Sequence, residues 1–313
     1  MKDNNRENSA YDIIGDIHGH AAELEALLHE LGYRELRTHF KHPEGRKVIF
    51  LGDYIDRGPE IRRSLSIVRG MIDAGEALGI LGNHEINALR YHHKGPDGEW
   101  LRPHWGNQKV QHQATLDQLA NKLPAEWEGW LHWLAQLPLY LDLPGLRAVH
   151  ASWFDSDISR IKDHEPLIDD ELIRLSSKGN PDADAIGQIL NGLELALPEG
   201  EAFETPDGRR RTEIRSRWWD DLREKNCREA VFPDDPRINE GSFILPDWHR
   251  PYPAAAKPVF FGHYAVRDVM PAPLADNVAC LDYGLGKGGQ LVAYRWDGEA
   301  KIDDSRFVSI PQI

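Results

Sequence analysis

Polar side chains that commonly bind metals follow five short apolar stretches of the sequence. In chain order they are Asp16 and His18, then Asp53, then Asn83 and His84, then His150, and finally His263. Carboxylate oxygens, imidazole nitrogens and amide oxygens are the ligands that hard and borderline divalent ions take. Six such groups suffice for two ions if one carboxylate bridges them, and two neighbouring ions suit an in-line displacement at phosphorus. The pattern therefore predicts a two-metal phosphoester hydrolase.

Each of these groups has an ordinary alternative explanation when it is taken alone. An Asp-x-His pair is usually polar loop chemistry, and Gly82-Asn83-His84-Glu85 could be a turn with a helix N-cap. A single histidine after a strand is more often a hydrogen-bonded core residue. The recurrence of the same ligand chemistry after five stretches is what favours a metal site.

The apolar stretches have the composition of short buried strands. We expect strands at 11–14, 48–51, 77–81, 146–149 and 259–261. Leucines at helical spacing predict a helix over 24–31, and Ile61 to Ile72 predict another. Strands and helices that alternate in this way indicate a parallel α/β sheet, in which ligands bind beyond the carboxyl ends of the strands. The polar loops are therefore expected at one edge of a sheet.

The remaining segments are less regular. Tyr91 to Gln113 is polar and is expected to cross the surface, and Trp127 to Leu137 favour a helix. Further expectations are a helix over 186–197, a turn at 205–208, and a closing hairpin of 277–281 and 290–296. The glycine-rich run 284–289 between them is interpreted as a turn, because it lacks the Gly-Lys-Ser/Thr ending of a phosphate-binding P-loop.

Three of the polar blocks resemble the signature of a known family. Gly15-Asp16-Ile17-His18-Gly19, Gly52 to Gly58 and Gly82-Asn83-His84-Glu85 are similar to the three blocks of the PPP-type phosphoprotein phosphatases, in the same order and at similar spacing. Val149-His150-Ala151 and Gly262-His263 resemble the two later histidine blocks. The resemblance covers roughly 11–300 and is closest to the bacterial PPP-type metallophosphoesterases, which include protein phosphatases and symmetrical dinucleoside tetraphosphate hydrolases.

The resemblance implies a role for each matching residue. Asp16 and His18 would hold one metal, Asp53 would bridge, and the other metal would take Asn83, His150 and His263. His84 would be the general acid, oriented by Asp56, and Arg57 would bind the phosphate, with Asn83 nearby. A salt bridge to Asp56 is the structural alternative for Arg57. The match is looser for a second phosphate arginine, where Arg217 is the first candidate and Arg211 another, and for a tyrosine, where Tyr283 is the candidate; surface solvation and core packing are their alternatives.

Three functions compete on this basis. The leading expectation is a phosphomonoesterase or protein phosphatase, which Glu85 favours because the tetraphosphate hydrolases tend to have Asp there. The alternative is a dinucleoside polyphosphate hydrolase, for which Trp100, His104, Trp105 and the arginines of 209–217 could bind bases and phosphates. A non-catalytic binding protein is disfavoured, because no ligand and no general acid is lost. Manganese is the expected metal, with iron and zinc as alternatives.

Length and composition set the wider frame. The 313 residues, of which 41% are hydrophobic, can form one large α/β domain without a stabilising metal or disulfide. We expect a disordered tail at 1–10, one domain over 11–300 with a less typical insert at about 155–250, and a C-terminal tail at 301–313. The resemblance implies a four-layer α/β/β/α sandwich of the calcineurin-like type.

Charge and targeting signals exclude several classes of partner. The net charge of −14 makes nucleic acid an unfavoured partner. Two cysteines without a CxxC pair favour a reducing compartment. The polar N-terminus lacks the apolar core of a signal peptide, and no apolar run is long enough to span a membrane. We therefore expect a cytoplasmic enzyme that acts on a phosphoprotein, a small phosphoester or a nucleotide.

Overall fold

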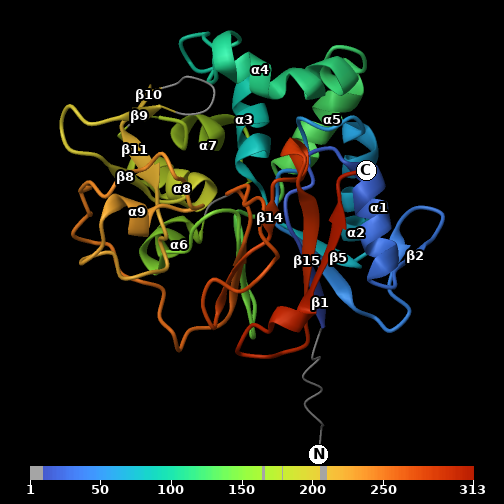
Figure 1. Ribbon diagram of the computed structural model, residues 1–313. Coiled ribbons are helices and arrows are strands. Elements are labelled where there is room, and N and C mark those ends of the chain that lie inside the picture. The colour runs from blue at the N-terminus through green and yellow to red at the C-terminus, as the bar shows by residue number, and fades with distance from the viewer. Residues whose placement is uncertain (1–9, 164–165, 178, 205–209) are drawn as a thin grey trace, which may run out of the picture.

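The computed structural model describes residues 10–163, 166–177, 179–204 and 210–313. The expected N-terminal tail, apart from Ala10, lies outside these residues, and so does the expected turn at 205–208. Within the described residues, two sheets pack against each other and helices cover their outer faces (Figure 1).

The first sheet has six strands in the order β14-β15-β1-β4-β5, with β16 on the outside of β15. Their bounds are β1 (Tyr11–Ile14), β4 (Lys47–Phe50), β5 (Ala77–Gly79), β14 (Asp282–Tyr283), β15 (Gln290–Trp296) and β16 (Phe307–Pro311). Strands β1, β4 and β5 run parallel, and Ile14 lies opposite Phe50, which in turn lies opposite Gly79. The polar loops that follow these strands therefore begin at the same edge of the sheet.

Two helices connect the parallel strands of this sheet. They are α1 (Ala21–Glu30) and α2 (Ile61–Asp73). Each buries one apolar stripe, with Leu24, Leu27 and Leu28 inward on α1 and Leu65 and Val68 inward on α2. A two-stranded ribbon, β2 (Arg34–Glu35) and β3 (Phe40–Lys41), follows α1.

The second sheet has the order β13-β12-β7-β6. Its strands are β6 (Tyr140–Asp142), β7 (Arg147–Val149), β12 (Val259–Phe261) and β13 (Val278–Cys280). It packs face to face on the first sheet, and the rings of Phe260 on β12 and Tyr294 on β15 lie 5.0 Å apart. Figure 1 shows α1 and α2 on one side of the paired sheets, and α6 (Asp155–Ile161) and α8 (Pro181–Asn191) on the other. The layered α/β arrangement expected from the sequence is therefore present.

The remaining elements lie above and beside the sheets. The upper group is α3 (Asn83–Tyr91), α4 (Gly106–Thr115), a π-helical stretch (Leu116–Ala120) and α5 (Pro124–Leu134). The segment 155–250 also holds α7 (Asp169–Arg174), β8 (Glu194–Ala196), β9 (Phe203–Glu204), β10 (Arg210–Arg211), β11 (Glu213–Arg215) and α9 (Cys227–Ala230). Short 3-10 turns occur at Leu285–Lys287 and Asp304–Arg306. Trp218, which is fully buried, packs on Phe154 and Phe261 and joins this segment to the second sheet.

Four expectations differ from the observed elements. The second half of the polar excursion 91–113 is helical, as α4, and it packs on the site described below. The helix expected over 186–197 ends at Asn191, because Gly192 adopts a left-handed φ of +80°. Val278–Cys280 joins the second sheet beside β12, so the expected hairpin is limited to β14 and β15.

The fourth difference concerns the C-terminus. Residues 301–313, expected as a tail, contribute β16, which pairs antiparallel with β15 from Phe307 to Pro311. This pairing satisfies backbone groups of β15 that would otherwise form an open sheet edge. Among the described residues, no helix has the length and apolarity that crossing a bilayer requires.

A buried carboxylate ties three strands of the first sheet together. Asp12 on β1 is fully buried and accepts hydrogen bonds from Arg46, just before β4, and from Arg295 on β15. Arg46 also donates to the carbonyl oxygens of Tyr11 and Trp296. Burying a carboxylate is costly unless it is paired and hydrogen-bonded, so these arginines stabilise the strand order that brings the polar loops together.

We predict that Arg46→Ala destabilises the fold by roughly 3 kcal/mol, because removing one partner leaves a buried charge poorly compensated. Thermal and urea unfolding measure the effect. Arg223→Ala is the matched control, because Arg223 pairs with Asp221 on the surface and its side chain is 74% exposed. Equal stability of the two variants would contradict a structural role for the Asp12 cluster.

Candidate metal centre

The six side chains expected as metal ligands converge at the carboxyl ends of the central strands. Asp53 lies in the middle: its carboxylate oxygens are 3.5 Å from His18 Nε2 and 3.5 Å from His150 Nε2. The side-chain oxygen of Asn83 is 3.0 Å from His150 Nε2 and 3.1 Å from His263 Nδ1. Asp16 completes the group at 3.9 Å from His18 Nε2 and accepts hydrogen bonds from the backbone N–H of His263. Five strand-end loops thus meet at one point.

Backbone carbonyls set the orientation of two of these imidazoles. His18 Nδ1 donates to the carbonyl oxygen of Ile55 at 3.1 Å, and His150 Nδ1 donates to that of Leu51 at 2.8 Å. Since the proton of a neutral imidazole is then on Nδ1, Nε2 presents its lone pair to Asp53 in both residues. This is the arrangement that a metal-binding histidine needs.

The protonation states of the site also suit a cation. Burial, assisted by the charge of Arg57, lowers the pKa of His18 well below its usual value, and burial with the charge of Arg215 does the same for His263. Burial raises the pKa of Asp16, and the neighbouring carboxylates of Asp282 and Asp53 raise it further. Neutral imidazoles and crowded carboxylates are the forms that a divalent ion stabilises.

Two buried nitrogen atoms test whether the residues fit a metal. His18 Nε2 and His263 Nε2 are buried and have no hydrogen-bond partner among the residues that the structure describes. A buried polar atom without a partner costs free energy, and folded proteins keep such atoms mainly where they bind an ion or take part in catalysis. Two groups of potential ligand atoms lie within 4.8 Å of one another, His18–Asp53–His84 and Asp16–Asp53–His150, and they share Asp53. The chemistry of these donors fits divalent ions beside a common carboxylate, although the two groups do not coincide with the ligand sets that the resemblance implies, since one contains His84 and the other joins Asp16 to His150.

Strained backbone at the loop ends brings the side chains inward. His18, Asp53, Asp56, Arg57 and His263 all have left-handed φ values, between +47° and +72°. Non-glycine residues rarely adopt this region, and such strain concentrates at functional sites.

Glycines make room for the carboxylates. A Cβ on Gly82 would lie 2.2 Å from Asp53 Oδ1, and a Cβ on Gly262 would lie 2.0 Å from Asp16 Oδ1. Each of these glycines belongs to a different block from the carboxylate beside it. The glycines of the motifs are thus required by contacts between blocks.

Glu85 holds the loop that carries Asp53. Its carboxylate is fully buried and accepts N–H bonds from Asp53 (2.8 Å), Tyr54 (2.8 Å), Ile55 (3.3 Å) and Gly82 (2.9 Å). Both oxygens are used as acceptors, so the side chain is fixed against the backbone and does not face a substrate. A shorter aspartate would not span this distance without movement of the backbone.

His84 and Asp56 form a hydrogen-bonded pair beside the metal ligands. His84 Nδ1 lies 2.6 Å from Asp56 Oδ2, and His84 Nε2 lies 3.9 Å from Asp53 and 3.3 Å from the guanidinium of Arg57. Burial alone would lower the pKa of His84, but the carboxylates of Asp53 and Asp56 outweigh it and raise this pKa. The exposed Arg57 side chain contacts His84. It does not form the salt bridge to Asp56 that was considered as its structural alternative.

Two further cations lie near the site. The sequence analysis named Arg215 only among the arginines of 209–217 and interpreted the segment of Lys287 as a turn, so neither residue was singled out. Arg215 at the end of β11 is the largest charge acting on His263. Its buried Nε lies 3.9 Å from Glu194 and has no hydrogen-bond partner in the described part of the chain. Lys287 lies in the glycine-rich turn, where burial and the charge of Arg57 lower its pKa. In the same turn, a Cβ on Gly286 would lie 2.7 Å from Arg57 Cδ, so the turn packs against Arg57.

The structure does not bring Arg217, Arg211 or Tyr283 to this group. The guanidinium of Arg217 pairs with Asp234 and lies over the ring of Phe232, and Arg211 pairs with Glu194. The hydroxyl of Tyr283 is buried and accepts the N–H of Ala272. These contacts give Arg217 and Tyr283 other partners, so they offer no support for a phosphate-binding role at either residue.

We predict that Glu85→Gln weakens metal binding about 10- to 100-fold, because its amide would present a donor to two backbone N–H groups. Titration with Mn²⁺, followed by the shift in melting temperature, measures the effect. Glu60→Gln is the control. The carboxylate of Glu60, like that of Glu85, accepts a backbone N–H, but only the one of Ala22 and at the surface. Metal affinities that are equal in the two variants would contradict the role assigned to Glu85.

Known proteins are similar in sequence to this chain. An asymmetrical bis(5'-nucleosyl)-tetraphosphatase from Halalkalibacterium halodurans is 41% identical over 81 residues, which are 26% of this chain and 33% of that protein. The chain therefore matches about a third of the length of this and similar relatives. A symmetrical bis(5'-nucleosyl)-tetraphosphatase from Ralstonia nicotianae is 24% identical over 303 residues, 90% of this chain and 87% of its own.

Solved structures and a family model extend the comparison. A protein serine/threonine phosphatase structure from Saccharomyces cerevisiae aligns with 99% of this chain and 81% of its own, at 12% identity and a TM-score of 0.47. The model of the calcineurin-like phosphoesterases matches residues 11–283, which include all six converging ligands. Since this match spans most of the chain, the protein belongs to the calcineurin-like phosphoesterase family.

Proposed function

We propose that this protein is a dinuclear metal-dependent hydrolase of phosphate esters and anhydrides. One observation carries the proposal: five strand-end loops bring six metal-type side chains together, with Asp53 at their centre, beside a His84–Asp56 pair and Arg57. Asp16 and His18 would hold one ion, Asn83, His150 and His263 would hold the other, and Asp53 would be shared between them. Manganese is our first choice, with iron and zinc as alternatives. Divalent ions in such a site supply Lewis acidity, which polarises a phosphoryl oxygen and acidifies water.

The chain's own side chains complete the chemistry. Arg57, beside His84, would bind the phosphoryl oxygens, and Arg215, whose charge acts on His263, is the candidate for a second such contact, because a guanidinium offers paired donors. Asp56 accepts a hydrogen bond from His84 Nδ1, so that Nε2 faces the substrate. His84 then gives its Nε2 proton to the leaving oxygen as general acid.

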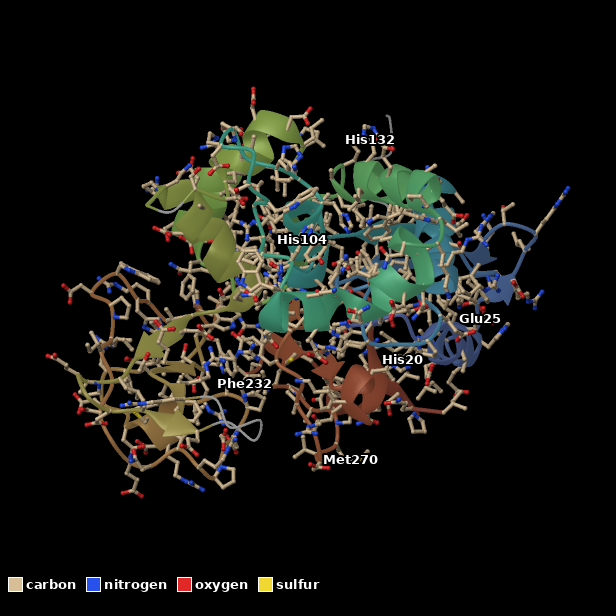
Figure 2. The ribbon with its side chains drawn as sticks, turned by 90° about the horizontal axis from the view of Figure 1, so that it is seen from above. His20, Glu25, His104, His132, Phe232 and Met270 are labelled. Carbon is tan, nitrogen blue, oxygen red and sulfur yellow. The ribbon has the colours of Figure 1, made fainter. Side chains whose placement is uncertain are left out.

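For the substrate, we propose a dinucleoside polyphosphate. The rings of Trp100, His104 and Tyr91 form a continuous stack, with centroids 4.4 and 3.8 Å apart, and Lys94 lies over Trp100. The stack belongs to the connection between α3, which carries His84, and α4, which contacts Asp56. Figure 2 shows His104 near the middle of the face on which these helices lie. Trp100 is 40% exposed, and a base that displaced the flexible side chain of Lys94 would stack on the face of the ring that His104 does not cover.

Two further considerations bear on this choice. The relatives named above are tetraphosphatases, which supports a nucleotide substrate. Glu85, the reason for favouring protein phosphatases, is buried against the backbone and carries no information about the substrate. A phosphomonoesterase acting on phosphoproteins remains the second candidate, favoured by the exposure of Arg57, which a bulky substrate can reach.

The metal-dependent chemistry makes a first prediction. Protein loaded with Mn²⁺ should hydrolyse p-nitrophenyl phosphate, and chelation should abolish this. Asp53→Asn should also abolish it, because a neutral amide replaces the carboxylate between His18 and His150. With phenyl phosphate, whose leaving oxygen needs protonation, His84→Asn should slow turnover about 10³-fold while the metal content, measured by elemental analysis, stays that of the unaltered protein. Normal turnover in both variants would refute the proposed function.

The substrate class makes a second prediction. In a phosphate-release panel, diadenosine tetraphosphate should be preferred over phosphoserine, phosphothreonine and phosphotyrosine peptides. Trp100→Ala should raise KM for the dinucleotide about 10-fold, as expected for one lost stacking contact. Trp248→Ala is the control, since Trp248 is also exposed but packs on Phe154 in the segment 155–250. Preference for the peptides would instead identify a protein phosphatase.

A further inference from the structure

Asp56 is shared by two histidines. Its Oδ2 accepts from His84 Nδ1 at 2.6 Å, whereas its Oδ1 accepts from His112 Nδ1 at 2.8 Å and from Thr115 Oγ1 at 2.5 Å. The backbone N–H of Asp56 also donates to Thr115 Oγ1, at 3.1 Å. The carboxylate is almost completely buried, so these groups account for its surroundings. One oxygen is thus used by His84, and the other is held by a separate helix.

That helix lies outside the blocks that carry the family resemblance. His112 and Thr115 belong to α4 and are three residues apart, so they lie on the same face, and both are buried. His112 lies in the polar segment 91–113 that was expected to cross the surface, and Thr115 follows that segment. α4 therefore has a specific contact with the proposed catalytic pair.

His112 is itself held in place from behind. Its Nε2 lies 3.2 Å from His92 Nε2, and the rings of Tyr91 and Trp127 lie 5.2 and 6.0 Å from its own ring. Burial, with His112 and His104 nearby, lowers the pKa of His92 to about 3, so His92 is neutral. The contacts form one chain, His92–His112–Asp56–His84, that begins in the connection after α3 and ends at the metal ligands.

Asp56 needs such support. Its φ of +68° is unfavourable for a residue with a side chain, so surrounding contacts must maintain it. A carboxylate held at one oxygen by two donors cannot rotate freely about its last bond. His84 Nδ1 consequently meets an acceptor in a fixed position, and the direction of its Nε2 is fixed with it.

We propose that His112, with Thr115, is a positioning residue for proton donation by His84. The inference rests on the proposed hydrolase function and adds a residue to its machinery. Among the described residues, the hydrogen bond from His112 to the proposed catalytic pair is the one to Asp56, so we expect it to act on His84 through Asp56. Its loss should affect the step in which the leaving oxygen is protonated, and it should affect that step most when the leaving group is a poor one.

The leaving-group dependence provides the test. 4-Nitrophenolate departs with little help from an acid, whereas phenolate and simple alkoxides need protonation. With Mn²⁺-loaded protein, His112→Ala should lower kcat about tenfold more for phenyl phosphate than for p-nitrophenyl phosphate, with a smaller effect on KM. His112→Asn, which keeps a donor near the position of Nδ1, should recover most of this difference. Thr115→Val, which removes the other donor to the same oxygen, should shift selectivity in the same direction.

A matched control separates positioning from general loss of structure. His249 is a buried histidine that bonds to the carbonyl oxygen of Trp218, far from Asp56 in the sequence and the fold. His249→Ala should lower stability without changing the ratio of the two rates. Equal losses on both substrates for His112→Ala and Thr115→Val would overturn the proposal.

A spectroscopic measurement distinguishes failure of this inference from failure of the proposed function. The Nδ1–H of His84, bonded to a buried carboxylate, should give a downfield proton resonance that is absent in His84→Asn. In His112→Ala this resonance should shift and exchange faster with solvent, even if neither ester is a substrate. An unaltered resonance would show that Asp56 holds His84 without help from α4 and would overturn the proposal.

Discussion

The carboxylate of Asp53 is the group on which the site depends. It lies within 4 Å of the imidazoles of His18, His84 and His150, which come from three different loops. One of its oxygens also accepts the backbone N–H of His84 at the start of α3. Because its own backbone is left-handed, it can hold this position only if neighbouring groups maintain the loop. Glu85 provides that support through four N–H bonds.

The charges and acceptor atoms of this cluster favour a bound cation. Carboxylates and neutral imidazoles are buried together, and two imidazole nitrogens have no hydrogen-bond partner within the described residues. Such a cluster has surplus acceptor capacity, which a divalent cation satisfies. Arg57, Arg215 and Lys287 lie around it and give an anionic substrate a local attraction, although the chain as a whole carries a charge of −14. The local field, rather than the net charge, is what a phosphate meets.

Supporting groups surround the ligands in successive layers. Glu85 fixes the loop of Asp53, and Asp282 accepts the N–H groups of Ala265 and Gly284 and so fixes the loops after β12 and β14. Farther out, α4 reaches Asp56, and the Asp12 cluster joins three strands of the first sheet. A displacement of one ångström is enough to impair catalysis, which explains why polar groups buried this deeply are retained.

The sequence by itself determined the strands, the ligand blocks and the family, because these depend on local patterns: short apolar runs followed by glycine and a ligand. It could not show that α4 contacts Asp56, that Val278–Cys280 joins the second sheet, or that residues 307–311 pair with β15. It also could not separate Arg215 from Arg217, because β11 ends at Arg215 and the chain turns before Arg217 pairs with Asp234. These outcomes depend on contacts between residues far apart in the chain, which only the packing of the two sheets and their covering helices decides.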